Sequence, residues 1–204
     1  MRLYHMLNAK YGLEALRKRR LKIATIMELN DPFEFLGVDL ADPMHSWAVR
    51  DTKRGLAQSQ GLLCFSRTWT NPVLWSHYAD RHRGMCLGFD LPRTFVRKVS
   101  YVARRPAIPS VVDQSFAKRL LFTKFSHWRY EQEFRSFVTL EEHEGGLYFM
   151  DFSDKLRLAE VTIGSESAVT RGAVAAAMGA SGQTTIFQAR AAASTFSIER
   201  EEAA

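Results

Sequence analysis

Cysteine is scarce in this chain of 204 residues, which contains only Cys64 and Cys86. Two cysteines in a chain of this length do not form a disulfide scaffold. Each lies within an apolar run, so we expect both to be buried, reduced thiols. No apolar run reaches the ~18 residues that a membrane-spanning helix needs, and the N-terminal residues do not resemble a signal peptide. We therefore expect a cytoplasmic protein that does not enter a membrane.

Several motifs of familiar enzymes are missing as well. The sequence has no CxxC or HExxH pair, and His77 and His82 are five residues apart, off a common helical face. We therefore expect no metal site. The glycines form neither a phosphate-binding loop nor a dinucleotide-binding fingerprint. Ser66 lacks the G-x-S-x-G context of a hydrolase nucleophile.

The charge balance is basic. Lysine and arginine number 28, against 22 aspartate and glutamate residues, which gives a net charge of +6. This excess favours an anionic partner such as nucleic acid or a phosphorylated ligand. The densest basic run, from Arg17 to Arg20, lacks the aromatic residues of a dedicated RNA-binding motif, so a solvated helix face is its simpler interpretation.

Short strands and helices alternate along the chain without a repeat or a low-complexity linker. Apolar runs and turn residues predict strands at residues 3–6, 21–24, 61–66, 85–90, 128–135, 156–163, 184–190 and 195–199. Apolar spacing and capping residues predict helices at residues 12–20, 72–84, 113–125 and 167–178, and a further helix that starts at Asp31. This order predicts a mixed α+β fold in a single domain spanning residues 1–204, of which 199–204 form a frayed tail.

The helix start at Asp31 has a clear local mechanism. Asp31 is suited to act as the N-cap, Pro32 occupies the first helical position, and Glu34 completes a capping box. This combination predicts a helix and carries little information about chemistry.

The most informative stretch is Trp128-Arg129-Tyr130-Glu131-Gln132-Glu133-Phe134-Arg135. Alternate side chains of a strand share a face, so we expect Glu131, Glu133 and Arg135 to point the same way. Two acids this close together tend to split their pKa values, which favours a catalytic site. The alternative is a solvated strand face on which Arg135 neutralises the acids. The octapeptide alone leaves both interpretations open.

Six blocks of the sequence resemble, in their order, the bacterial family catalogued as domain of unknown function 2971. The blocks are Leu3-Tyr4-His5, Leu29-Asn30-Asp31-Pro32-Phe33-Glu34, Cys64-Phe65-Ser66, Trp75-Ser76-His77-Tyr78-Ala79, His82-Arg83-Gly84-Met85-Cys86-Leu87-Gly88-Phe89 and the octapeptide from Trp128 to Arg135. The resemblance spans residues 5–198. It implies membership of that family and no particular activity.

The layout also resembles, more distantly, the ADP-ribosyltransferase fold, a split sheet with flanking helices. In that fold an N-terminal strand supplies a histidine or arginine to NAD, and a late strand supplies the catalytic glutamate. Tyr4-His5 and the Leu-rich helix after it are similar to the start of DNA-modifying and tRNA-phosphate-removing members. Glu131-Gln132-Glu133 matches the late motif, a Gln or Glu, any residue, then Glu. The resemblance therefore implies that Glu133, or Glu131 beside it, is the catalytic acid.

The same resemblance implies a set of NAD-binding residues: Tyr4, His5, Ser66, Tyr78 and His82. His5 would hold the ribose or a phosphate, Ser66 would end the supporting strand, and Tyr78 would stack on nicotinamide. Each residue also has a structural interpretation. His5 can cap a core strand, Ser66 can form a strand-end turn, and Tyr78 can be a buried tyrosine with a satisfied hydroxyl group. His82, four residues after Tyr78 on the predicted helix, can bond that tyrosine or a strand carbonyl.

Two functions follow from these observations. The first is an NAD-consuming ADP-ribosyltransferase, a toxin or phage-defence effector that modifies nucleic acid or protein and needs a neutralising partner protein. A preorganised carboxylate would stabilise the positive charge that builds on the ribose as nicotinamide leaves. The second is a non-enzymatic nucleic-acid-binding protein of the same fold. A nuclease would need a divalent metal, for which the ligand spacing offers little support.

Overall fold

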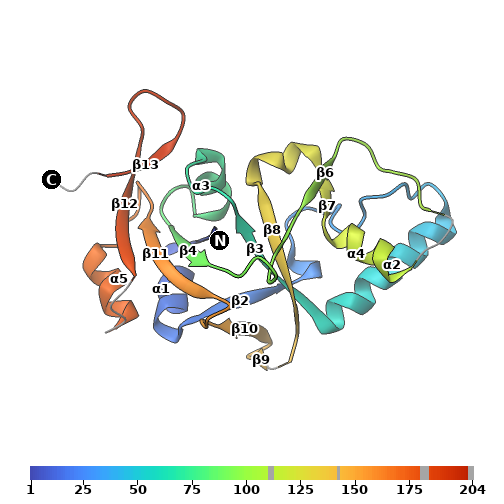
Figure 1. Cartoon of the computed structure of the whole chain (residues 1–204), viewed down its shortest axis with the longest axis horizontal. Coiled ribbons are helices and arrows are strands. Elements are labelled where there is room, and N and C mark those ends of the chain that lie inside the picture. Colours follow the sequence, from blue (N-terminus) through green and yellow to red (C-terminus); the bar gives the residue numbers. More distant parts are fainter. Residues whose placement is uncertain (110–112, 142, 180–183, 202–204) are drawn as a thin grey trace. The chain divides into compact units, whose positions relative to one another are not determined.

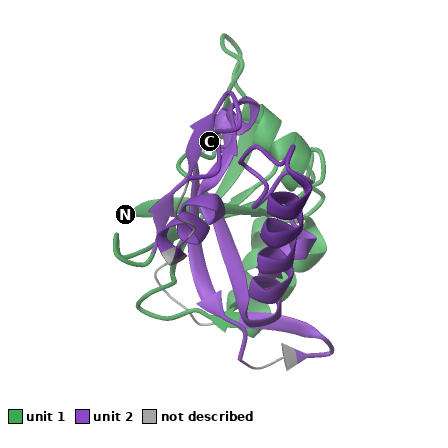
Figure 2. Cartoon of the chain, turned by 90° about the vertical axis from the view of Figure 1, so that its right-hand side faces the viewer, with its two compact units in different colours: residues 1–21, 65–95, 150–204 green, residues 22–64, 96–149 purple. Residues whose placement is uncertain are grey.

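The computed structural model describes residues 1–109, 113–141, 143–179 and 184–201. The chain divides into two compact units, shown in different colours in Figure 2. Unit 1 comprises Met1–Leu21, Phe65–Phe95 and Met150–Ala204, and unit 2 comprises Lys22–Cys64 and Val96–Phe149. Helices and strands occur in both units, and the sheet is mixed, so the mixed α+β class is confirmed. The single domain of residues 1–204 stays a prediction.

Unit 1 is built around strand β4 (Figure 1). Its elements, in chain order, are β1 (Arg2–Leu7), α1 (Ala9–Lys18), α3 (Pro72–Tyr78), β4 (Met85–Asp90), β11 (Arg157–Ile163), α5 (Arg171–Met178), β12 (Thr185–Ala191) and β13 (Ile198–Arg200). β4 pairs antiparallel with β1 on one side and with β11 on the other. β12 runs parallel to β11, and β13 is antiparallel to β12.

β4 is apolar on both faces because helices cover both. Met85 lies against Gly12 of α1, where an added Cβ would come within 2.3 Å of the methionine sulfur. The next residue, Cys86, is a buried thiol that packs in one cluster with Trp75 of α3. Successive residues of a strand point to opposite faces, so α1 and α3 lie on opposite faces of this sheet. A strand covered on both sides forms a continuous apolar run, which is why the sequence predicts it.

Unit 2 combines strands with the helices α2 and α4. Its elements, in chain order, are β2 (Arg20–Thr25), η1 (Ile26–Glu28), α2 (Pro43–Ser59), β3 (Gln60–Ser66), β5 (Arg97–Lys98), β6 (Ser100–Val102), α4 (Gln114–Leu121), β7 (Thr123–Phe125), η2 (Ser126–Glu131), β8 (Glu133–Thr139), β9 (His143–Glu144) and β10 (Leu147–Asp151). The first two residues of β2 and the last two of β3 and of β10 belong to unit 1. β3 pairs with β2 and with β8, and β5 pairs with β8. The short strands β6 and β7 form a separate parallel pair.

The core of unit 2 lies between these helices and the segment that precedes α2. Val49 of α2 and Phe116 and Leu120 of α4 belong to one buried cluster with Phe35. The sequence analysis did not predict α2, although Asp42 and the proline that follows it form a standard helix start. The apolar face of this helix is weak, because Val49 is the residue of it that is buried, and the sequence pattern therefore did not reveal the helix.

Most of the other predicted elements are present. The predicted strands correspond to β1, β2, β3, β4, β11, β12 and β13, and the helices predicted at 12–20, 113–125 and 167–178 overlap α1, α4 and α5. Glu199 and Arg200 belong to β13 and pair with β12, so they are not part of a frayed tail. Residues 202–204 of that predicted tail lie outside the described residues.

The helix predicted from Asp31 does not form. Asp31 accepts a hydrogen bond from the backbone nitrogen of Phe33, at 2.9 Å, but the segment stays a turn. Phe35 has a φ of 65°, which lies outside the right-handed helical region. Glu34 does not complete a capping box, because its carboxylate binds Arg135. A tertiary contact has overridden a strong local signal.

The helix that begins at residue 72 ends at Tyr78, well before the predicted end at residue 84. Asp80, Arg81 and His82 have φ values of 47°, 54° and 68°, in the left-handed region that non-glycine residues rarely adopt. The backbone nitrogen of His82 donates to the carbonyl of Trp75, at 3.2 Å, and so fixes the turn to α3. Tyr78 and His82 therefore do not share a helix face, and that prediction is wrong.

Gly84, which follows this turn, is required by a close approach of two backbone segments. A Cβ added at this position would meet the carbonyl oxygen of Leu7 at 2.1 Å. We expect Gly84→Ala to lower the free energy of unfolding by about 3 kcal/mol, because rigid backbone has to move to admit the methyl group. Urea unfolding followed by circular dichroism measures this change.

Gly55, inside α2, provides the matched control. An added Cβ there meets no described atom from elsewhere in the chain within 4 Å. We expect Gly55→Ala to raise the free energy of unfolding by about 1 kcal/mol, the difference in helix propensity between the two residues. Equal effects of the two substitutions would contradict the close packing at Gly84.

Candidate functional site

The seven residues that the sequence analysis singled out are divided between the units. Five lie in unit 1, namely Tyr4, His5, Ser66, Tyr78 and His82, and two lie in unit 2, namely Glu131 and Glu133. Within unit 1, the structure brings Tyr4 and Ser66 together as partners in the pairing of β1 with β3. Within unit 2, Glu131 and Glu133 bind the same lysine, Lys124.

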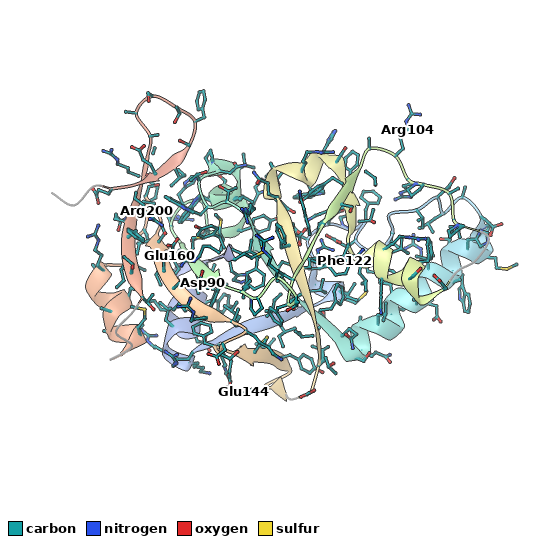
Figure 3. The ribbon with its side chains drawn as sticks, viewed as in Figure 1. Asp90, Arg104, Phe122, Glu144, Glu160 and Arg200 are labelled. Atoms are coloured by element: carbon teal, nitrogen blue, oxygen red, sulfur yellow. The ribbon has the colours of Figure 1, made fainter. Side chains whose placement is uncertain are left out.

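The hydroxyl group of Tyr4 belongs to an ionic network in unit 1. It donates to Glu160 of β11, and burial together with that carboxylate raises the pKa of Tyr4 to about 12. Arg2 binds Glu160 at 2.6 Å and Asp90 at 2.7 Å. Arg200 binds Glu160 from the other side, at 2.9 Å. Figure 3 labels Asp90, Glu160 and Arg200 of this group, which we call the Glu160 network.

Gly88 makes room for the Glu160 network. Tyr4, Gly88 and Glu160 are aligned across β1, β4 and β11 by the strand register. A Cβ at Gly88 would come within 2.4 Å of the Cγ of Glu160. The missing side chain therefore lets the glutamate extend across β4 towards β1. This geometry provides a structural role for Tyr4, and its assignment to NAD stays a prediction.

His5 and Ser66 also have local contacts. The ring of His5 meets Phe65 edge-on, with 5.9 Å between the ring centroids. Ser66 accepts through its Oγ a hydrogen bond from the backbone nitrogen of Thr68, at 3.1 Å. That bond forms the strand-end turn which the sequence analysis named as the structural role of this serine. The assignment of His5 and Ser66 to NAD stays a prediction.

His82 lies at the edge of a cavity in unit 1. Its ring stacks on Trp75, with centroids 6.3 Å apart and an angle of 15° between the planes. Its Nε2 lies 3.2 Å from the Oγ of Ser76. The cavity, of about 500 Å³, is completed mainly by residues 191–198, between β12 and β13. His82 is thus held beside a space of the size of a small-ligand site, and its role towards NAD, like that of the half-buried Tyr78, stays a prediction.

The two acids of unit 2 belong to a buried group of charged side chains, which we call the carboxylate cluster. Its members, none more than 6% exposed, are Glu34, Lys124, Glu131, Glu133 and Arg135. Charged side chains are almost never buried to this extent unless they are paired. They come from the turn after η1, from β7, from η2 and from β8.

Arg135 is the centre of the carboxylate cluster. It binds Glu34 through both terminal nitrogens, at 2.8 and 2.5 Å. It binds Glu133 through Nε at 2.7 Å and through Nη2 at 2.9 Å. A further bond, of 2.9 Å, goes to the carbonyl of Leu121. The five N–H groups of the guanidinium are therefore all used inside the protein.

Lys124 contacts the acids from another direction. Its Nζ lies 2.5 Å from Glu131, 3.2 Å from Glu133 and 3.5 Å from Glu34. The same ammonium lies over the ring of Trp128, 4.8 Å from its centroid. Burial lowers the pKa of Lys124, but the three carboxylates outweigh burial and hold the pKa above its ordinary value. The lysine is therefore a permanent cation.

The carboxylate cluster keeps Glu133 ionised. Burial raises the pKa of this glutamate, but Arg135 and then Lys124 outweigh burial and lower the pKa to about 2. The backbone nitrogen of Glu133 donates to the hydroxyl group of Tyr101, at 2.8 Å. The thiol of Cys64 lies beside the same carboxylate, and burial raises its pKa well above the ordinary value. With three carboxylates and two cations, the cluster carries a formal charge of −1.

The sequence predicts that Glu131, Glu133 and Arg135 share one face of a strand, but they do not belong to one strand, although Glu133 binds Arg135 and both acids bind the same lysine. β8 begins at Glu133, whereas Glu131 ends the 3-10 helix η2. Between them Gln132 has a φ of 46°, in the left-handed region, so the chain is not extended there. The strand predicted at residues 128–135 is therefore wrong in its first half. The three side chains are buried, and so they do not form the solvated face of the alternative interpretation.

Glu34 and Lys124 were missed as members of this group. Glu34 was missed because the sequence analysis assigned it to the capping box of a predicted helix, which gave it a structural role. Lys124 stands between Phe122 and Phe125 in an apolar segment, and a lysine in such a position was the available signal. Glu34 reaches the cluster from a segment that is distant in sequence from β8, whereas Lys124 lies only nine residues before Glu133.

Among the described residues, no group of three or more His, Cys, Asp or Glu side chains is arranged to hold a metal ion. The same part of the chain has no helix with the length and apolar character needed to cross a membrane. No family model, curated protein or solved structure matches the chain. Function is therefore inferred from the residues and their geometry.

Arg135 offers a test of the carboxylate cluster as a stabilising element. We expect Arg135→Met to lower the free energy of unfolding by about 3–5 kcal/mol, because Glu34 and Glu133 lose their principal cation while they stay buried. Urea unfolding measures the change. The matched control is Arg157→Met, since Arg157 binds Asp90 with a side chain that is 61% exposed. Its loss should cost less than about 1 kcal/mol, and a comparable loss in both variants would contradict the role of burial.

The lowered pKa of Glu133 makes the free energy of unfolding depend on pH in the acidic range. The pKa is about 2 in the folded chain, against an ordinary value of 4.5. Ionised Glu133 therefore contributes stability that is complete above pH 4.5 and is lost as the pH falls towards 2. We expect the difference in unfolding free energy between the unmodified chain and Glu133→Gln to shrink across this range. Urea unfolding of both proteins at a series of pH values measures it, and a constant difference would refute the assignment.

Proposed function

We propose that the chain is an NAD-dependent ADP-ribosyltransferase-like protein, in which Glu133 and Glu131 supply the catalytic carboxylates. The observation that carries the proposal is the carboxylate cluster, a buried group with a formal charge of −1. It includes both acids of the Glu131-Gln132-Glu133 motif, which resembles the late motif of that fold. The six ordered blocks that resemble the family of unknown function 2971 carry a separate proposal, membership of that family, which implies no particular activity.

The reaction would break the bond between nicotinamide and C1′ of the ribose. Nicotinamide leaves with the bonding electrons, and positive charge builds on the ribose, as in glycoside hydrolysis. A nucleophilic oxygen or nitrogen of the acceptor then forms a bond to C1′ and releases its proton to a carboxylate or to water. Negative charge fixed in a dry environment attracts this transition state more strongly than the ground state.

The burial of the acids sets a requirement for this reaction. Glu131 and Glu133 are 4% and 5% exposed and face protein atoms, so the residues around them have to move when NAD binds. In the same proposal, Tyr4, His5, Ser66, Tyr78 and His82 hold NAD. The acceptor is nucleic acid or protein, and the biological role is that of a toxin or phage-defence effector restrained by a neutralising partner protein.

Release of nicotinamide from NAD tests this proposal. We expect the purified protein to release nicotinamide, and we expect Glu133→Gln or Glu131→Gln to slow the release by at least about 100-fold, the effect of removing one electrostatic group from a transition state. NAD at about a hundred times its dissociation constant should also stabilise the unmodified chain by about 2.7 kcal/mol. Chromatography of the products and thermal unfolding with and without NAD measure the two effects.

Glu28→Gln is the matched control. Glu28 is also a glutamate of unit 2 and binds a lysine, but its partners are Lys22 and the backbone of Thr25, and none of these residues is assigned to NAD or to the carboxylate cluster. The control variant should release nicotinamide at a rate within about twofold of that of the unmodified chain. Circular dichroism has to show that each variant is folded. An equal loss in all three variants, or no release of nicotinamide, would remove NAD chemistry as the function.

The complete use of the Arg135 donors favours a second candidate function. An arginine whose five N–H groups are all bound inside the protein is typical of a structural element. The chain would then be a non-enzymatic nucleic-acid-binding protein, consistent with its net charge of +6. The NAD experiment separates the two candidates, because a non-enzymatic protein releases no nicotinamide, whether or not the carboxylate cluster is altered.

A further inference from the structure

A cavity of about 340 Å³ lies in unit 2, beside the carboxylate cluster. Its walls come from the turn after η1, from the segment that follows β6 and from β7. Lys124, whose ammonium binds the cluster, also lines the cavity. The volume lies within the range of about 300–1,000 Å³ that is usual for small-molecule sites.

Two aromatic rings of the cavity are exposed to solvent. Phe33 is 54% exposed and Phe125 is 41% exposed. The ring of His127 lies against Phe125, with 4.4 Å between the centroids. Large apolar side chains that stay exposed in a concave site are suited to contact a flat ligand. The aromatic surface therefore fits a planar ring.

Two arginines give the cavity a positive rim. The guanidinium of Arg105 lies over the ring of Phe33, 4.9 Å from its centroid, and Arg104 extends away from the ribbon at the segment after β6 (Figure 3). Both arginines are exposed. No acidic side chain is among the described residues that line the cavity. A ligand with an anionic group is therefore favoured over a cationic one.

The walls of the cavity are fixed by contacts that do not involve a ligand. Phe125 and Val102 are partners in the parallel pairing of β6 with β7. The turn that carries Phe33 is held by the bond from its backbone nitrogen to Asp31. Lys124 is held by the carboxylate cluster. Aromatic rings placed in advance reduce the entropy that a ligand loses on binding.

We propose that this cavity binds a nucleotide, with the base against Phe33 or Phe125 and a phosphate on Arg104 and Arg105. Base stacking on aromatic side chains accepts any base, and guanidinium groups bind phosphate through paired hydrogen bonds. A free nucleotide and one nucleotide of a single strand share this chemistry. The proposal does not depend on NAD cleavage, because it uses none of the acids assigned to that reaction.

Binding of 5′-AMP and of a fluorescein-labelled oligouridine strand tests the site. Calorimetry measures the first and fluorescence anisotropy the second, both with the full chain at one fixed salt concentration. We expect at least one of these probes to bind, and we expect Phe33→Ala and Arg105→Gln each to weaken that binding by about 10-fold. Binding of 5′-AMP identifies a site for free nucleotides, whereas binding of the strand alone identifies a site for nucleotides within a strand.

Two control variants separate the site from general effects of charge and apolar surface. Trp47 is 64% exposed and Arg54 is exposed, both on α2 in unit 2, and neither lines the cavity. Trp47→Ala and Arg54→Gln should leave the affinity within about twofold. The proposal is overturned if neither probe binds below millimolar concentration, or if the controls weaken binding as much as the cavity variants do. Because 5′-AMP contains no nicotinamide bond, these outcomes are independent of the nicotinamide-release measurement, which alone decides NAD chemistry.

Discussion

Arg135 and Glu34 form a bidentate salt bridge in unit 2, and each of the two side chains is only 2% exposed. Once this pair is buried, the surrounding structure has to supply every remaining partner. Glu133 and the carbonyl of Leu121 take up the other donors of Arg135. Glu34 in turn is drawn out of the helix that its own neighbours favour. The turn after η1 and the start of β8 are thus both consequences of one pair.

The sequence predicts most elements whose cause is local and is wrong where a distant contact decides the conformation. β3 and β4 were predicted because continuous apolar runs identify strands that are covered on both faces. The helix at Asp31 was predicted from an equally clear pattern, and the long-range bond of Glu34 to Arg135 overrode it. Two misses have local causes instead: the left-handed conformation of Gln132 interrupts the strand predicted at 128–135, and Lys124 was missed although it lies only seven residues before Glu131.

The two ionic groups of the chain illustrate different physical regimes. In the Glu160 network, Arg2 is 35% exposed and Arg200 is 39% exposed, so water screens part of the attraction. That network needs only the absence of a side chain at Gly88 to form across β4. In the carboxylate cluster, water is excluded, and each charge depends on the presence of the others. A single substitution is therefore far more disruptive in unit 2 than in unit 1.

The distance along the chain between Glu34 and Arg135 has a consequence for synthesis. The two residues are 101 positions apart. At a translation rate of about 5–20 residues per second, the ribosome makes Glu34 roughly 5–20 s before its partner exists. During that interval, the early half of unit 2 carries a carboxylate that it has no means of burying. The core of unit 2 is therefore completed only once Arg135 has been made, about two-thirds of the way along the 204 residues.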